Sequence, residues 1–194
     1  MIKNFLTTIS LMFFLSGCSP SFTFSTQDIT PSKQIINLDL TEITVTTPSE
    51  EPSKIIRIED CSKEEISSNV ILSWGVALKD ALKKSELFTK SATKKVNLLV
   101  TILEIDLPVF AADVTTKVSS NYKLIDNLTK TILYDDTVKT EANVPWNYSF
   151  FGYKRGLESI NLTVQKNIAT FISNLQNHFT KNNLNYILKS KKIN

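Results

Sequence analysis

The chain has 194 residues, of which 42% are hydrophobic and 21% are charged, and its formal net charge is only +3. This length suits a leader followed by one domain with a real core, but not two ordinary domains. A nucleic-acid-binding protein normally carries a basic stripe, so the small positive excess argues against nucleic acid as a partner. With two cysteines and one histidine, the chain has too few ligands for a typical zinc site, and we expect no metal and no cofactor.

Residues 1–17 have the pattern of a secretory signal. Lys3 supplies a positive charge, and residues 5–15 then form an uncharged, mostly apolar run. As a helix this run is roughly 16 Å long, well short of the ~30 Å hydrocarbon core of a bilayer. We therefore predict an export signal and not a membrane span.

The residues that end this run, Leu15-Ser16-Gly17-Cys18, resemble the lipobox of bacterial lipoproteins. The resemblance implies cleavage between Gly17 and Cys18, a diacylglycerol joined to the Cys18 thiol, and a further acyl chain, such as palmitate, on the new amino group. Two or three acyl chains, at about 0.8 kcal/mol per buried methylene, give a stable anchor. Ser19 stands where an aspartate would retain such a protein at the inner membrane, so the resemblance implies the periplasmic face of the outer membrane.

A polar linker is predicted next. Residues 18–34 are rich in Ser, Thr and Pro, and we expect a lipidated Cys18 followed by a flexible tether that reaches at most about 50 Å. The domain is predicted to occupy residues 35–180, and the polar, basic residues 181–194 are expected to form a solvated tail. Cys61 would then have no partner for an intramolecular disulfide, and we expect a partly buried free thiol.

The domain begins with strand-like segments and a helix. Apolar and polar residues alternate over 35–46, which predicts a half-buried strand, and residues 55–58 suit a short second strand. From residue 63 to residue 86, apolar residues recur at three- and four-residue steps. This period predicts an amphipathic helix with Trp74 on its buried stripe.

Three strands and a second helix follow. Residues 96–107 are apolar on both faces, which suits a central strand, while residues 114–124 and 131–140 suit a hairpin with one wet face. The sequence thus predicts an α+β domain with a mostly antiparallel sheet and two long amphipathic helices packed on one face, in the order β-(β)-α-β-β-β-α. The stripe of the second helix consists of Leu157, Ile160, Val164, Ile168, Phe171, Leu175 and Phe179.

No pattern typical of an enzyme appears in the sequence. His178 lies near the end of the second predicted helix, where we expect it to complement the helix dipole. Asp135 and Asp136 are neighbours on a predicted strand, so their side chains point to opposite faces. Neither a Gly-x-Ser-x-Gly motif nor a Gly-rich phosphate loop is present. We therefore expect a non-catalytic protein.

Residues 144–156 concentrate aromatic side chains beside two bases. We expect the aromatic residues to cap the open end of the core while the bases solvate the start of the helix. The alternative is a contact with a protein partner or a lipid, because aromatic residues and arginine are frequent at binding hot spots. The candidate residues are Trp146, Tyr148, Phe150, Phe151, Tyr153, Lys154 and Arg155.

Three segments between residues 74 and 175 resemble small periplasmic lipoproteins of the YajG-like kind and the auxiliary lipoproteins of lipid-transporting ABC systems. In the segment that contains the turn after Asp126, Lys130 stands where a glycine is usual. No catalytic residue comes with the resemblance. The three segments are the helix that ends in Leu87-Phe88, the strand Tyr122-x-Leu124-x-Asp126 with its turn, and Gly152 and Arg155 leading to Asn167, Ile168 and Phe171.

The resemblance implies an accessory or structural component of a lipid or transport complex in the cell envelope. Its expected partners are the membrane, through Cys18, and one or more envelope proteins. The alternative, from another class of function, is a module that itself binds a lipid or glycan in a groove beside residues 144–156.

Overall fold

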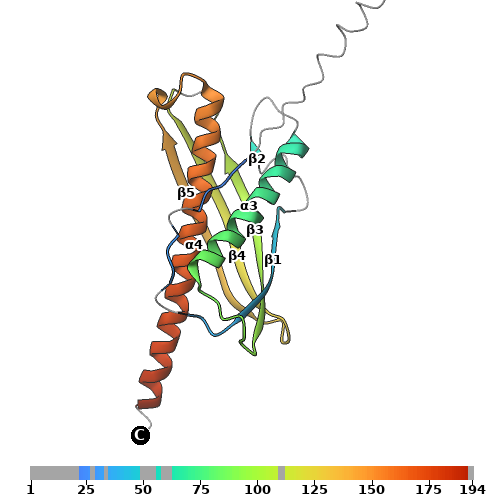
Figure 1. Ribbon diagram of the computed structural model, residues 1–194, viewed down its shortest axis with the longest axis vertical. Helices are drawn as coiled ribbons and strands as arrows, with labels where there is room; N and C mark the ends of the chain where they lie inside the picture. The colour runs from blue at the N-terminus through green and yellow to red at the C-terminus, as the bar shows by residue number, and fades with distance from the viewer. Residues whose placement is uncertain are drawn as a thin grey trace, which may run out of the picture.

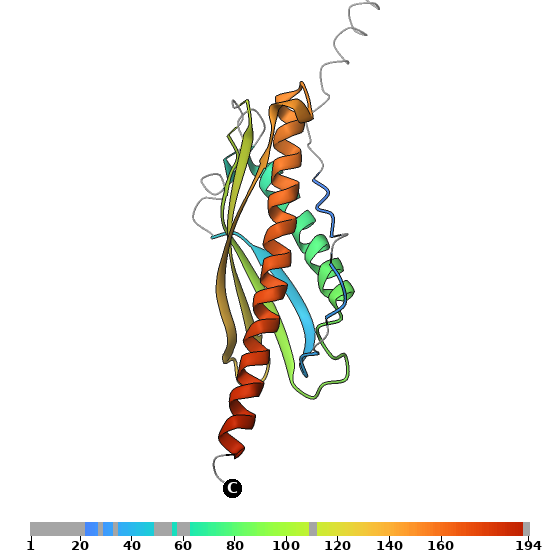
Figure 2. The same cartoon turned by 90° about the vertical axis from the view of Figure 1, so that its left-hand side faces the viewer.

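The computed structural model describes residues 22–26, 29–32, 35–48, 56–57, 63–108 and 112–191. Two helices lie on one face of a single sheet (Figure 1, Figure 2), and the predicted α+β class and element order are confirmed. The elements are β1 (Asp39–Thr46), β2 (Ile56–Arg57), α3 (Lys63–Ser85), β3 (Lys95–Asp106), β4 (Val114–Asp126), β5 (Ile132–Val144), the short 3₁₀ helix η2 (Trp146–Tyr148) and α4 (Gly152–Lys191).

The sheet is mixed, with the strand order β1-β3-β4-β5 and with β2 paired to the second half of β3. The long strands β3, β4 and β5 are antiparallel to one another, whereas β1 and β2 run parallel to β3. A parallel neighbour requires a crossover connection, and α3 supplies it between β1 and β3. β3 is central, as its apolar character on both faces predicts.

The core fills the space between the helices and the sheet. Alternate residues of β3 from Val96 to Ile102 are fully buried on the helix-facing side. The register of β3 against β4 shifts between Ile102 and Glu104. This bulge returns Ile105 to the buried face, because an extra residue reverses the alternation of a strand.

The apolar stripe predicted for the last helix is confirmed on α4. Its central residues, from Ile160 to Leu175, are fully buried, and the ring of Phe171 stacks on that of Tyr122 with centroids 4.0 Å apart. The helix does not end at residue 180 but continues to Lys191, so its last turns extend beyond the strands (Figure 2). The backbone of residues 181–191 is therefore helical where we expected a tail.

A buried polar row holds α4 on the sheet. Ser159, Thr163 and Asn167 lie four residues apart on α4 and are fully buried. The Asn167 side-chain oxygen accepts hydrogen bonds from the hydroxyls of Ser120 at 2.6 Å and Tyr122 at 2.8 Å, and its amide donates to a carbonyl of β5 at 3.1 Å. Buried polar groups need partners, so this row favours one register of the helix on the strands.

The predicted tether is wrong for residues 22–26. Phe22 and Phe24 are buried, and the ring of Phe24 lies edge-on to that of Trp74 with centroids 6.4 Å apart. The hydroxyl of Ser73 donates to the Phe22 carbonyl at 2.9 Å. Burying a phenylalanine contributes roughly 1.5–3 kcal/mol, so Phe22 and Phe24 both stabilise the packing of this segment on α3.

The β4–β5 hairpin forms with Lys130 at a φ of 59°, a left-handed conformation that favours glycine. The Asp126 carboxylate stabilises the turn by accepting the backbone N–H groups of Leu128 at 2.8 Å and Thr129 at 2.9 Å. Lys94 Nζ lies 3.1 Å from its other oxygen. The Thr129 N–H, followed by the contacts with Lys94 and Leu128, lowers the pKa of Asp126 to about 2.

Candidate functional site: an exposed aromatic surface

The aromatic stretch within residues 144–156 lies at the end of the sheet where β5 ends and α4 begins (Figure 1). Pro145 follows the strand with a φ of −71° and a ψ of 158°, and Trp146–Tyr148 form one turn of 3₁₀ helix. Proline has no N–H to donate to a strand ladder. The chain thus leaves the sheet before the aromatic residues begin, and they do not continue the alternation of β5.

All five aromatic side chains of the stretch are exposed. Phe150 is 94% exposed and Trp146 68%, and Tyr148, Phe151 and Tyr153 are each more than half exposed. The expectation that they cap the core is therefore wrong. We refer to these five residues as the aromatic surface.

Smaller apolar residues close this end of the core instead. Val144 and Leu107 are buried. Gly156 of α4 lies so near Leu107 that a Cβ on the glycine would be 3.5 Å from a leucine methyl group. Because the second turn of α4 packs directly on the end of β3, the core at this end needs no aromatic cap.

The chain itself holds the aromatic surface in place. The Trp146 backbone N–H donates to the Asp113 carboxylate at 3.0 Å. Arg155 Nη1 donates to the carbonyls of Ser149 at 2.5 Å and Phe150 at 3.2 Å. Arg155 is therefore a positioning residue for this loop. A loop whose backbone is ordered before binding loses less entropy when a partner covers it.

The rings and charges of the surface also contact one another. The rings of Phe150 and Phe151 meet edge to face with centroids 5.9 Å apart, and Lys154 Nζ lies 5.5 Å from the centroid of Phe151. That separation is within the range of a cation–π interaction. The Glu158 carboxylate beside Tyr148 raises the pKa of that phenol. The surface is thus apolar with charges of both signs at its edge.

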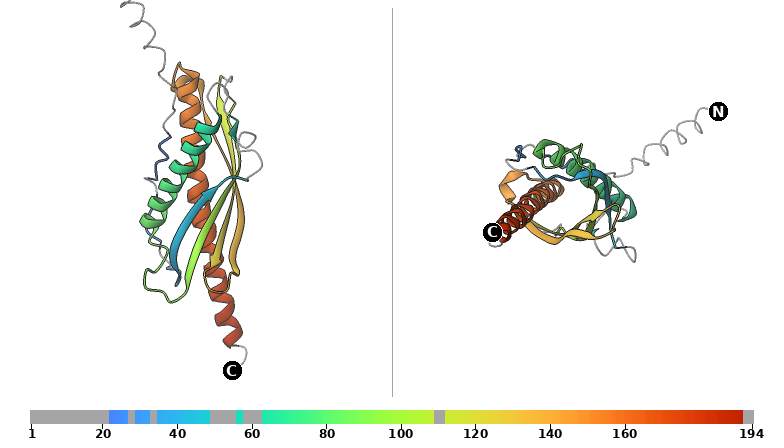
Figure 3. Two further views of the ribbon diagram at one scale, coloured as in Figure 1. Left: turned by 90° about the vertical axis from the view of Figure 1, so that its right-hand side faces the viewer. Right: turned by 90° about the horizontal axis from the view of Figure 1, so that it is seen from below.

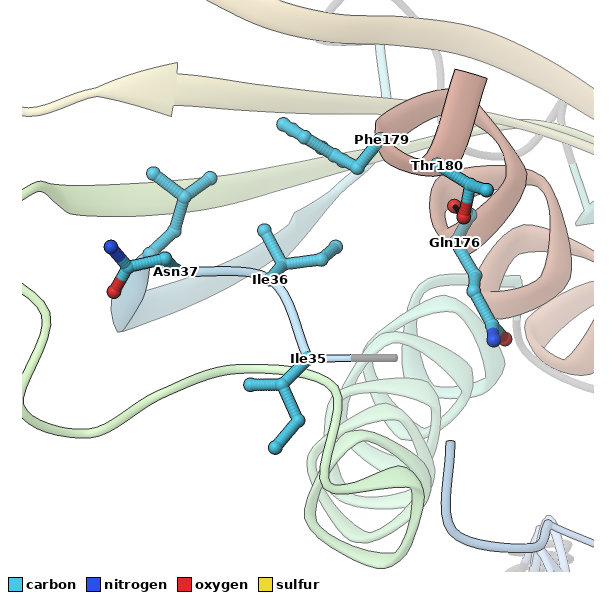
Figure 4. A pocket seen from close by; sticks show the side chains of 7 residues that line it. Ile35, Ile36, Asn37, Gln176, Phe179 and Thr180 are labelled. Carbon is cyan, nitrogen blue, oxygen red and sulfur yellow. Dashed lines mark hydrogen bonds between the residues drawn. The ribbon is translucent and has the colours of Figure 1, made fainter. Parts of the chain in front are cut away.

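Two hollows of the protein lie away from the aromatic surface, beside the C-terminal half of α4. One of about 220 Å³ lies between residues 35–38 and α4, and Figure 4 shows Ile36 and Phe179 on two of its sides. Another, of about 390 Å³, is polar and includes Asp136 and His178 in its lining. Neither provides the groove beside residues 144–156 that the lipid- or glycan-binding alternative requires.

The remaining polar candidates do not converge on one site. The Asp135 carboxylate accepts from Asn121 at 2.8 Å on the open face of the sheet, whereas Asp136 accepts from Tyr134 at 3.0 Å on the helix side, as predicted for strand neighbours. His178 is not at a helix end, because α4 continues well past it; its ring lies edge-on to Tyr134 at 5.3 Å. Among the residues that the structure describes, no three His, Cys, Asp or Glu side chains gather to hold a metal ion.

The predicted cleavage and lipidation positions, Gly17 and Cys18, lie outside the described residues, as does Cys61. Within the described ranges, neither helix combines the length and the apolar content that crossing a bilayer requires.

No protein-family model and no curated protein matches the sequence. Among solved structures, the chain is similar to a Xanthomonas campestris protein of the family model DUF330. The TM-score is 0.55 and the identity 7%, and the match covers 85% of this chain and 97% of that one. The two chains share a fold. At this identity the likeness extends to the backbone alone.

Two other similar structures come from bacterial proteins. A hypothetical protein from Chlamydia trachomatis has a TM-score of 0.46 at 10% identity, covering 72% of this chain and 96% of that one. A minor lipoprotein from Acinetobacter baumannii has a TM-score of 0.38 at 8% identity, covering 68% of this chain and 89% of that one. Scores below 0.5 do not establish a shared fold.

Proposed function

We propose that the protein is a lipid-anchored, non-catalytic accessory component of a cell-envelope assembly, held through Cys18 on the periplasmic face of the outer membrane. The apolar run of residues 5–15 and the lipobox-like Leu15-Ser16-Gly17-Cys18 support the anchor. Ser19 supports the choice of membrane, because it is not the aspartate expected of an inner-membrane lipoprotein.

The exposure of the aromatic surface supports a role in binding a partner. Five large rings within eight residues are exposed although the core at that end is closed without them. Large apolar side chains exposed close together typically mark a binding site. Aromatic residues are also the commonest anchors of binding hot spots. Side chains as exposed as Phe150, at 94%, favour contact with a large partner over enclosure of a small ligand.

Replacement of the two cysteines tests the anchor. Cys18→Ser removes the thiol that lipidation requires, so we expect it to abolish incorporation of labelled palmitate and release the protein from the membrane fraction. Cys61→Ser is the matched control, because Cys61 is the only other cysteine, and it should keep both label and membrane association. Undiminished label in Cys18→Ser would overturn the proposed anchor.

Crosslinking in intact envelope tests the accessory role. The lipidated protein, purified after crosslinking, should retain a defined envelope protein in constant proportion. A matched control is the lipobox-bearing leader fused to an unrelated domain, which shares the anchor but not this fold and should retain none of that protein. Equal recovery with both would contradict an accessory role for the domain.

A further inference from the structure

We propose that the aromatic surface is a membrane-docking site, seated in the headgroup layer of the same bilayer that holds Cys18. This inference rests on the proposed lipid anchor and names the partner of the aromatic surface. It places the domain upright, with the N-terminal ends of α3 and α4 toward the membrane.

The N-terminal segment runs beside α3. Its described residues follow α3 in the same direction: the Phe22 carbonyl is bound by Ser73, in the middle of α3, and the Ser32 N–H donates to the carbonyl of Ser85, at its end, at 2.7 Å. Phe22, the first described residue of the segment, is therefore nearer to the N-terminal end of α3 than Ser32 is.

The stretch from Cys18 to Phe22 is short. Cys18 precedes Phe22 by four residues, which span at most about 14 Å when fully extended. Ser73 lies ten residues after Lys63, or roughly 15 Å along the helix axis from the start of α3. The acyl chains of Cys18 are thus confined close to this part of the domain, and the domain cannot stand far off the bilayer.

The aromatic surface lies at that same end. Both helices begin at one end of the molecule, where β5 passes into η2 and α4 (Figure 1, Figure 3). The β4–β5 hairpin, with Leu128 at its tip, lies at the opposite end, because the 13 residues of β5 separate the two. At about 3.3 Å per residue, that separation is about 40 Å. The segment that begins at Cys18 therefore enters the domain toward the end that carries the aromatic surface. We expect both to face the bilayer.

The chemistry of the surface suits a headgroup layer. Tryptophan and tyrosine rings, apolar with one polar group, concentrate at membrane interfaces, and phenylalanine rings enter the acyl boundary. Trp146, Tyr148, Phe150, Phe151 and Tyr153 supply this combination. Near them, Asp113 and Glu158 oppose the charges of Lys154 and Arg155. The aromatic rings should therefore provide most of the binding to the headgroup layer. This binding should change little when the salt concentration is raised.

The two tryptophans provide a direct test. Trp146 is exposed on the aromatic surface, whereas Trp74 is fully buried in the core, and the chain has no third tryptophan. The lipidated protein is placed in phosphatidylcholine/phosphatidylglycerol vesicles with or without bromine on the acyl chains. We expect brominated lipid to quench most of the Trp146 emission. The Trp146→Phe variant, which reports Trp74 alone, should lose little emission and shows that the core is folded.

Paired charge variants show which end of the domain is seated. Phe150→Asp places a charge in the proposed headgroup contact and should sharply reduce the quenching of Trp146. Leu128→Asp alters a side chain that is 90% exposed at the opposite end and should leave the quenching unchanged. Raising the salt concentration should not restore Trp146 emission in the wild type.

Flotation of the same vesicles separates the two proposals. Protein that floats with the vesicles while Trp146 stays unquenched keeps the anchor and overturns the docking inference. Lipid-modified wild-type protein that fails to float overturns the anchor and, with it, the inference that depends on it. Flotation together with quenching that Phe150→Asp removes supports both.

Discussion

The ring of Phe24 lies edge-on to that of Trp74, with centroids 6.4 Å apart and ring planes at 76°. Trp74 is fully buried on the stripe of α3, so this contact joins the segment before the first strand to the core of the domain. Residues 22–26 therefore belong to the fold. Of the tether predicted over residues 18–34, residues 22–26 are thus packed on α3 and do not act as a flexible linker.

Phe24→Ala tests this attachment. Removing a buried phenylalanine side chain leaves a cavity and typically lowers the free energy of unfolding by about 3 kcal/mol or more. Thr23→Ala, at the exposed neighbouring position, should change stability by no more than about 0.5 kcal/mol. Denaturant unfolding curves give both values. Equal, negligible effects would mean that the segment is a free tether after all.

Asn167→Ala tests the polar row under α4. The change leaves the buried hydroxyls of Ser120 and Tyr122 without their acceptor, and it should lower the free energy of unfolding by about 2–4 kcal/mol. Tyr122→Phe removes one of those donors. In a double-mutant cycle the two changes should be coupled by about 1 kcal/mol, since they share a hydrogen bond. Strict additivity would contradict the observed contact.

Acid unfolding tests the turn at Asp126. Because the pKa of this carboxyl is about 2 in the folded protein and ordinarily 3.8, the folded state binds fewer protons between those values. The stability that Asp126 contributes should be complete above its ordinary pKa and should disappear as the pH falls through 4 to 2. Asp126→Asn cannot titrate, so the gap in unfolding free energy between wild type and variant should close over this range. If the difference in unfolding free energy between the two proteins did not change with pH, the lowered pKa of Asp126 would be contradicted.

Lys130→Gly should stabilise the protein. A side chain at positive φ costs roughly 1–2 kcal/mol, and part of that gain is offset by the greater freedom of glycine in the unfolded chain. We expect a net increase of about 0.5–1 kcal/mol in the free energy of unfolding. Lys130→Ala is the control, because it removes the charge and keeps the strain, and it should show no such gain.

Elements with a regular apolar period could be predicted from the sequence. The stripe around Phe171 on α4, the helix that carries Trp74 and the central strand β3 all show their period directly in the chain, because burial on one face dictates it. The order of the elements then fixed the α+β class. These features depend on residues close together in sequence.

The features that could not be predicted depend on residues far apart. Asn167 carries no sign in the sequence that Ser120 and Tyr122 will meet its side chain. Phe24 lies in a polar stretch that looks like a linker until α3 is placed beside it. We expected the aromatic residues after Pro145 to cap the core, but the chain leaves the sheet at the proline and their side chains are exposed.

Site-specific photo-crosslinking in intact envelope tests the central claim, that the aromatic surface is the docking surface of the anchored domain. A photoreactive phenylalanine analogue replaces Phe150 in one variant and Leu128, of nearly equal exposure, in another. We expect abundant adducts with membrane lipid at position 150 and few at position 128. Equal, low yields at the two positions would show that the aromatic surface faces water and does not dock on the membrane.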